Sequence, residues 1–91
     1  MPDPLSRENM VADARAATLA LLTRRAAEAT VCPSEVARAL AGDDPAADWR
    51  GLMPVVHAAV DAMVAEGLVR LSWQGEPMPM RDGPYRIALL G

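Results

Sequence analysis

The sequence predicts a mainly α-helical domain that ends in a small β-hairpin. Its 91 residues suffice for one domain with a single core. Apolar residues recur at helical spacing in three separate stretches, and two later β-prone stretches flank a segment rich in Gly and Pro. Hydrophobic residues make up 52% of the chain and charged residues 23%, which indicates a globular protein rather than a disordered one.

The first helix is expected over residues 7–27. Pro2 and Pro4 oppose helix formation, so residues 1–6 are predicted to be a disordered leader and residues 7–91 a single domain. The residues expected on the apolar face of this helix are Val11, Ala14, Thr18, Leu21 and Leu22, with Leu19 at its edge.

A short β-prone stretch, residues 29–31, precedes a second helix expected over residues 33–41. Pro33 takes the first helical position and Glu35 follows two residues later, as in a capping box, whereas Cys32 is a weak cap. Gly42 is a good C-terminal stop. The stretch at 29–31 would add a third strand to the hairpin sheet.

Pro54 is expected to mark the start of the third helix, over residues 52–66. Because Pro54 has no N–H to give to the carbonyl of Arg50, a turn at residues 45–50 should meet this helix at an angle. Gly67 ends the helix.

The two strands of the hairpin are expected over residues 68–74 and 85–90. The prolines and glycines between them predict no regular pairing across residues 75–84. The apolar faces of these elements predict a single hydrophobic core. Its predicted members are Leu22, Val36, Leu40, Leu52, Val56, Val60, Met63 and Ile87.

This order of elements is that of a winged helix-turn-helix domain, with three helices, a short strand and a two-stranded wing. The stretch from Thr30 to Leu40, the Asp48-Trp49-Arg50 step and the Glu66-Gly67 helix exit resemble a bacterial family of short uncharacterised proteins, a domain of unknown function. The resemblance covers about residues 14–90. It implies a winged-helix fold and no established activity.

Charge and composition restrict the function classes. Nine arginines, no lysines and twelve acidic residues give a net charge of −3, so the domain lacks the overall positive field that draws many proteins to nucleic acid. The single Cys32 excludes an internal disulfide and a multi-cysteine zinc site. Neither a secretory signal nor a run of about 18 apolar residues is recognisable, so a cytoplasmic protein without membrane contact is expected.

Double-stranded DNA is the first expected partner, with a transcription-regulatory role. In winged-helix proteins the third helix enters the major groove, and the wing, here about residues 75–84, touches the DNA backbone. Arg50 is placed to read guanine, although Asp61 beside it would repel phosphate. The candidate DNA-binding residues are Arg50, His57, Arg70, Arg81 and Arg86.

The alternative is a protein-interaction or dimerisation module without DNA contact, which binds a second copy or another protein. Exposed Met in the Pro-rich wing is adaptable contact surface. The candidate residues are Leu19, Trp73, Met78 and Met80. Charge geometry separates the two hypotheses: arginines 50, 70, 81 and 86 on one face favour DNA, whereas scattered arginines with exposed Met78 and Met80 favour a protein partner.

The protein is not expected to be an enzyme. Cys32 is interpreted as a small buried residue, and His57 with Asp61 one turn later as an exposed ion pair. Metal-ligand spacing and Gly-rich phosphate loops are not recognisable, so no catalytic residue, cofactor or metal is expected. Trp49 is interpreted as a cap on the core beneath the third helix.

Overall fold

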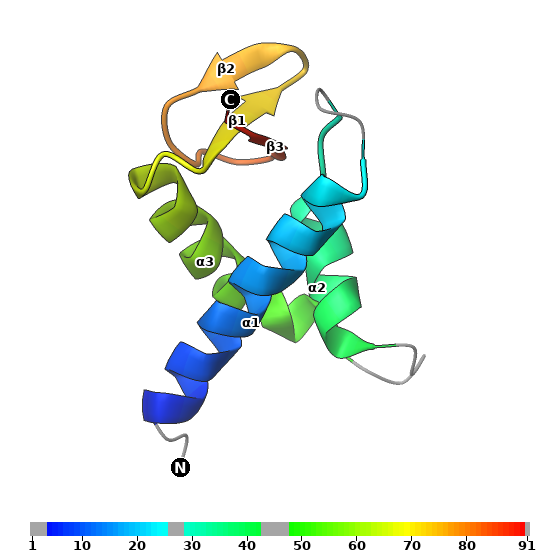
Figure 1. Ribbon diagram of the computed structural model, residues 1–91, viewed down its shortest axis with the longest axis vertical. Helices are drawn as coiled ribbons and strands as arrows, with labels where there is room; N and C mark the ends of the chain where they lie inside the picture. Colours follow the sequence, from blue (N-terminus) through cyan, green and yellow to red (C-terminus); the bar gives the residue numbers. More distant parts are fainter. Residues whose placement is uncertain (1–3, 26–28, 43–47, 91) are drawn as a thin grey trace.

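The computed structural model describes residues 4–25, 29–42 and 48–90. Within these ranges, helices and strands follow one another in the order that Figure 1 shows. Their bounds are α1 Pro4–Thr23, α2 Pro33–Ala41, the 3-10 turn η1 Arg50–Leu52, α3 Met53–Ala65, β1 Val69–Trp73, β2 Glu76–Met78 and β3 Arg86–Leu89.

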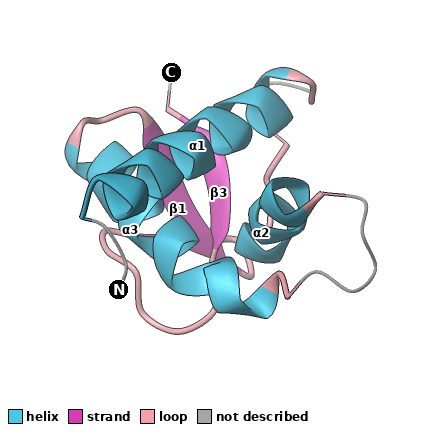
Figure 2. Ribbon diagram, turned by 90° about the horizontal axis from the view of Figure 1, so that it is seen from below, coloured by secondary structure: helices cyan, strands magenta, loops and turns pink. Residues whose placement is uncertain are grey.

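The three helices pack together, and the sheet lies at one end of them (Figure 1). α1 packs against both α2 and α3. The three strands form one antiparallel sheet in the order β2-β1-β3. Seen from below, β1 and β3 lie behind the helices (Figure 2). The predicted fold class is therefore confirmed as a mainly helical, winged-helix-like domain, in which residues 69–89 form the wing.

Helix α1 begins and ends earlier than predicted. It starts at Pro4 rather than at residue 7, so residues 4–6 are helical and not part of a leader; residues 1–3 lie outside the described ranges. A proline fits the first turn of a helix because its missing N–H would be unpaired there in any case. The helix ends at Thr23, and the N–H of Arg25 donates to the carbonyl of Leu22 in a closing turn.

Helix α2 spans residues 33–41 as predicted. The Glu35 carboxylate accepts the backbone N–H of Cys32 at 3.2 Å and so satisfies a donor at the helix start. Pro33 stands in the first turn of the helix. At the other end, the N–H of Gly42 donates to the carbonyl of Arg38 at 3.1 Å.

Pro54 stands in the first turn of α3, as predicted. The chain before it forms the 3-10 turn η1, in which the N–H of Gly51 donates to the Asp48 carboxylate. The expected helix start at residue 52 is one residue early, because α3 begins at Met53.

The prediction of no pairing across residues 75–84 is wrong for β2. Residues 76–78 pair with β1, with Leu71 opposite Met78 and Trp73 opposite Glu76. Gln74 and Gly75 connect the two strands with φ of 52° and 83°, the positive values that tight hairpin turns require. β2 is an edge strand, so Pro77 is tolerated even though it has no N–H.

The predicted strand at residues 29–31 is a single bridge. Val31 donates to and accepts from the backbone of Ile87, at 2.8 and 2.9 Å, on the side of β3 away from β1. The third strand of the sheet is therefore β2.

The core lies between the helices and the inner face of the sheet. Six of the eight predicted members are buried, namely Leu22, Val36, Val56, Val60, Met63 and Ile87. Leu40 near the end of α2 and Leu52 in η1 are only partly buried against this cluster. The buried Thr18 donates its hydroxyl to the carbonyl of Ala14 at 2.7 Å, which satisfies its polar group.

Candidate functional site between the third helix and the wing

A shallow apolar groove of about 250 Å³ lies between the wing and the first turns of α2 and α3. We call it the wing groove. Its lining residues are Cys32, Pro33, Ser34, Met53, His57, Trp73, Gly83, Pro84 and Tyr85. Trp73 is 40% exposed at the end of β1, so an indole face is open to solvent here.

His57 and Tyr85 join α3 to the wing across this groove. The two side chains form a hydrogen bond of 2.7 Å between Nδ1 and the phenol oxygen. Burial is the largest cause that lowers the pKa of His57 and raises the pKa of Tyr85, so near neutral pH the imidazole is neutral and the phenol protonated. This hydrogen bond forms with either neutral tautomer of His57, because the phenol can donate to Nδ1 or accept from an Nδ1–H.

Asp61 and Arg81 make a second connection between α3 and the wing. Arg81 donates from Nε to Oδ1 and from Nη2 to Oδ2, both at 3.0 Å, in a bidentate pair. The hydrogen bonds from Arg81 hold the pKa of the Asp61 carboxyl below its usual value. The pair borders a second hollow of about 340 Å³, which Val64, Ala65 and Met80 also line.

The predicted ion pair between His57 and Asp61 is therefore wrong, because each residue bonds to a wing residue instead. Tyr85 and Arg81 are the partners that sequence reasoning missed. Tyr85 alternates with Ile87 and both are buried, but only tertiary packing brings the Tyr85 hydroxyl to His57.

The candidate DNA-binding residues do not converge on one face. Arg50 stacks on Trp49 beside η1, and Arg81 is bonded to Asp61. Arg86 donates to the hydroxyl and the carbonyl of Thr30. Arg70 is exposed and shares the outer face of the sheet with Arg86, since Ala88 and Ser72 are their respective cross-strand partners.

Helix α3 offers few groups that read DNA. Its only polar side chains are His57 and Asp61, and the rest of the helix is Met, Pro, Val and Ala. Base readout in the major groove uses arginine, lysine, amide, hydroxyl or carboxylate side chains placed on the inserted helix. Here the imidazole and the carboxylate are already engaged with the wing.

Trp49 is partly buried against the core, as predicted, and its ring also contacts two arginine side chains. The guanidinium carbons of Arg38 and Arg50 lie 4.7 and 4.5 Å from the centre of its ring, in cation–π contact. Arg50 therefore stacks at the turn between α2 and α3.

The candidate protein-interaction residues divide into two groups. Leu19 and Met78 pack partly buried against the core. Trp73 and Met80 are exposed, at 40% and 71%. The wing therefore presents two large apolar side chains to solvent, one at each hollow.

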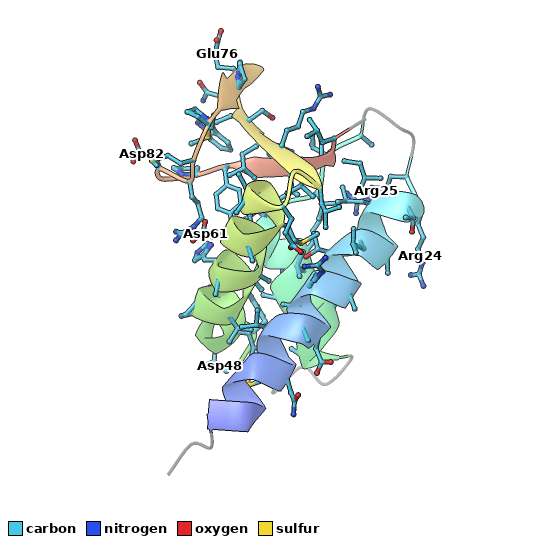
Figure 3. The ribbon with its side chains drawn as sticks, turned by 60° about the vertical axis from the view of Figure 1, so that its left-hand side comes forward. Arg24, Arg25, Asp48, Asp61, Glu76 and Asp82 are labelled. Atoms are coloured by element: carbon cyan, nitrogen blue, oxygen red, sulfur yellow. The ribbon has the colours of Figure 1, made fainter. Side chains whose placement is uncertain are left out.

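Two carboxylates of the wing are unpaired, as is Arg70 on the outer face of the sheet, among the residues that the structure describes. Glu76 and Asp82 are exposed, and neither forms an ion pair with another described residue. Glu76 lies opposite Trp73 in the sheet, and Asp82 directly precedes Gly83 of the wing groove. In Figure 3, Asp61, Glu76 and Asp82 lie along one side of the molecule, away from Arg24 and Arg25.

Cys32 and His57 both line the wing groove, although their spacing along the chain does not predict that they lie together. The half-buried thiol lies 3.1 Å from the hydroxyl of Ser34. Within the described ranges, His, Cys, Asp and Glu form no group of three that could hold a metal ion.

The family described as "Protein of unknown function (DUF3253)" matches residues 11–90 of the chain. No curated protein matches it. Across the part of the chain that the structure describes, no helix is long and apolar enough to cross a membrane.

Proposed function

Because the chain belongs to the DUF3253 family, whose description names no activity, we propose from its geometry that it is a protein-docking module. The wing groove binds a segment of another protein that carries apolar side chains beside lysine or arginine. The module acts as an adaptor without catalysis, and the DNA hypothesis becomes the second candidate.

The observation that carries this proposal is the chemistry of the α3 and wing surface. Winged-helix proteins turn this surface towards DNA, and DNA requires several cations there. On this surface the Arg81 guanidinium is already bonded to Asp61, while Glu76 and Asp82 remain exposed. Carboxylates around an apolar groove repel phosphate and attract basic side chains.

The apolar lining supports a protein partner rather than a polar metabolite. Trp73 and Met80 are the two large apolar side chains that the wing exposes. Aromatic residues and Met are enriched at protein–protein interfaces, where one or two anchors supply most of the binding energy.

A second copy of the chain is a poor occupant of the groove. A symmetric dimer joins one surface to the same surface of its partner. Such an interface would contain Glu76 and Asp82 of both copies, and an excess of like charge in an interface is unfavourable. The partner is therefore a different protein with basic and apolar side chains.

A display library of random short peptides tests the proposal directly. Selection on the intact protein is expected to enrich peptides with apolar residues next to Lys or Arg. Trp73→Ala should weaken the enriched peptides about tenfold or more, as expected for an interface anchor. Met10→Ala is the matched control, because Met10 is 38% exposed on α1, and it should leave binding unchanged.

Two results would overturn the proposal. One is the absence of any peptide enriched over a selection without the protein. The other is a set of peptides that bind the Trp73→Ala and wild-type proteins equally, with both proteins folded by circular dichroism.

The DNA hypothesis has its own test, an anisotropy titration with a mixed-sequence duplex at low salt. We expect no saturable binding at tens of micromolar protein, where non-specific binders register. Saturable binding that Arg50→Gln weakens would favour DNA instead, because Arg50 is the candidate for a base contact.

A further inference from the structure

We infer that the wing groove binds a proline-rich segment in the polyproline II conformation with a lysine or arginine beside the prolines. This inference rests on the docking role proposed above and specifies the conformation of the segment. Two properties of the groove support it: the apolar rings that line it and the carboxylates beside it.

The lining combines flat aromatic and prolyl rings. Trp73 supplies an exposed aromatic ring and Pro84 an exposed prolyl ring, and the lining also contains the buried Tyr85 and Pro33. Polyproline II segments dock on aromatic-lined grooves of this kind through their own prolyl rings. The groove of about 250 Å³ is smaller than typical drug-sized pockets of about 300–1,000 Å³, so it suits a few side chains of a peptide.

The exposed surface of the groove is almost wholly apolar, so it favours the rings and aliphatic side chains of a ligand over polar groups. A polyproline II chain has no internal hydrogen bonds and keeps its backbone carbonyls in solvent, and its prolines have no N–H that would need a partner in an apolar groove.

The carboxylates beside the groove determine which charged residue of the ligand lies next to its prolines. Glu76 lies across the sheet from Trp73, and Asp82 comes directly before Gly83, so carboxylates stand beside the groove on the wing. Lys or Arg next to the prolines meets these carboxylates, and an acidic residue there would be repelled.

The groove is also held in shape before binding. Tyr85 is buried and bonded to His57, and Asp61 bonds the wing loop to α3 through Arg81. A rigid site and a stiff polyproline II ligand both lose little conformational entropy on association.

Three synthetic peptides test the inference by NMR of the ¹⁵N-labelled protein. The first repeats Pro-Pro-Leu and carries two arginines at one end. The second replaces its prolines by alanine and lysine to give an amphipathic helix with the same arginines. The third keeps the prolines and has glutamate in place of each arginine.

The two tryptophans of the chain provide a reporter and an internal control. The first peptide should shift the indole N–H resonance of Trp73 and leave that of Trp49 in place, since Trp49 lies outside the groove. It should bind about tenfold or more tightly than the other two. Glu76→Gln with Asp82→Asn should remove most of this preference for arginine over glutamate, whereas Asp13→Asn on α1 should not.

The outcomes separate the two proposals. If the helical peptide shifts Trp73 and the proline peptide does not, the conformation inferred here is wrong and the docking role stands. If the arginine and glutamate peptides bind equally, the proposed role of the carboxylates is wrong. If none of the peptides shifts Trp73, the inference fails, and the display selection decides whether docking at this groove fails with it.

Discussion

Arg81 of the wing loop forms a bidentate ion pair with Asp61 of α3, twenty positions earlier in the chain, with both hydrogen bonds at 3.0 Å. The side chains are 35% and 50% exposed. The pair joins the wing loop to the helix at the edge of a hollow, so the position of the loop depends on a solvent-screened contact.

This pair should contribute little to stability. A double-mutant cycle with Asp61→Asn and Arg81→Gln, measured by urea unfolding, should give a coupling energy of about 0.2–1 kcal/mol. Added salt should reduce it, because the side chains are exposed. A coupling energy that is unchanged at high salt would contradict this description of the pair.

The environment of His57 predicts a specific response to Arg81→Gln. His57 is the only histidine of the chain, so its Hε1 resonance reports the titration without overlap from another imidazole. After burial, the positive charge of Arg81 is the next cause that lowers its pKa, while Asp61 raises it. Arg81→Gln should therefore raise the pKa of His57, and Arg24→Gln, directly after the C-terminal end of α1, should not. A lower pKa in Arg81→Gln would contradict the assigned geometry.

The same histidine should make stability depend on pH. The pKa of His57 in the folded protein lies below its ordinary value of about 6.5, so the unfolded chain takes up the proton first as the pH falls. Acidification through about pH 6.5 should reduce the free energy of unfolding, and above this range His57 contributes no pH dependence. Urea unfolding between about pH 7.5 and 5 should show a smaller fall for His57→Gln than for the wild type. If the free energy of unfolding fell equally in His57→Gln and in the wild type, the pH dependence would come from other titratable groups.

The turn between β1 and β2 allows a clean test of backbone conformation. Gly75 has φ of 83°, and the position where a Cβ would stand has no atom within 4 Å. Gly75→Ala should therefore destabilise the wing by about 1–2 kcal/mol through backbone strain alone. Gln74→Asn should act in the opposite direction, because Asn-Gly is a preferred pair in such turns. Equal thermal midpoints for all three proteins would contradict the assigned turn.

The different burial of two core side chains predicts different losses in the free energy of unfolding when each is replaced by alanine. Met63 is fully buried, so Met63→Ala should cost about 2–5 kcal/mol. Leu40 is only partly buried, and Leu40→Ala should cost less because less apolar surface returns to water. Urea unfolding of both variants measures the two losses in free energy. A larger loss for Leu40→Ala than for Met63→Ala would contradict the assigned burial of these side chains.

Local signals in the sequence predicted the helices better than the wing. Pro33 and Gly42 bracket α2, and Pro54 marks the start of α3, because these residues act on the backbone next to them. β2 was missed because its proline suggested a loop. An edge strand needs partners on one side only, a condition that depends on the neighbouring strands.

The candidate site was only partly predictable for a related reason. Exposed Trp73 and Met80 followed from their places in the wing. The partners of Asp61 and His57 stand 20 and 28 positions away in the chain, so helical spacing could not identify them. Sequence spacing suggested a contact within α3, and packing of the wing against this helix replaced it.

The two edges of the sheet also bear on aggregation. One edge, along β3, is occupied at Ile87 by the two backbone bonds of Val31. The other edge is β2, which has three residues and at its centre a proline without an N–H to donate. Short or covered edges with proline resist the addition of a foreign strand. Within the described residues the sheet therefore gives an incoming chain little template for fibril growth, and recruitment of a partner depends on side chains rather than on backbone pairing.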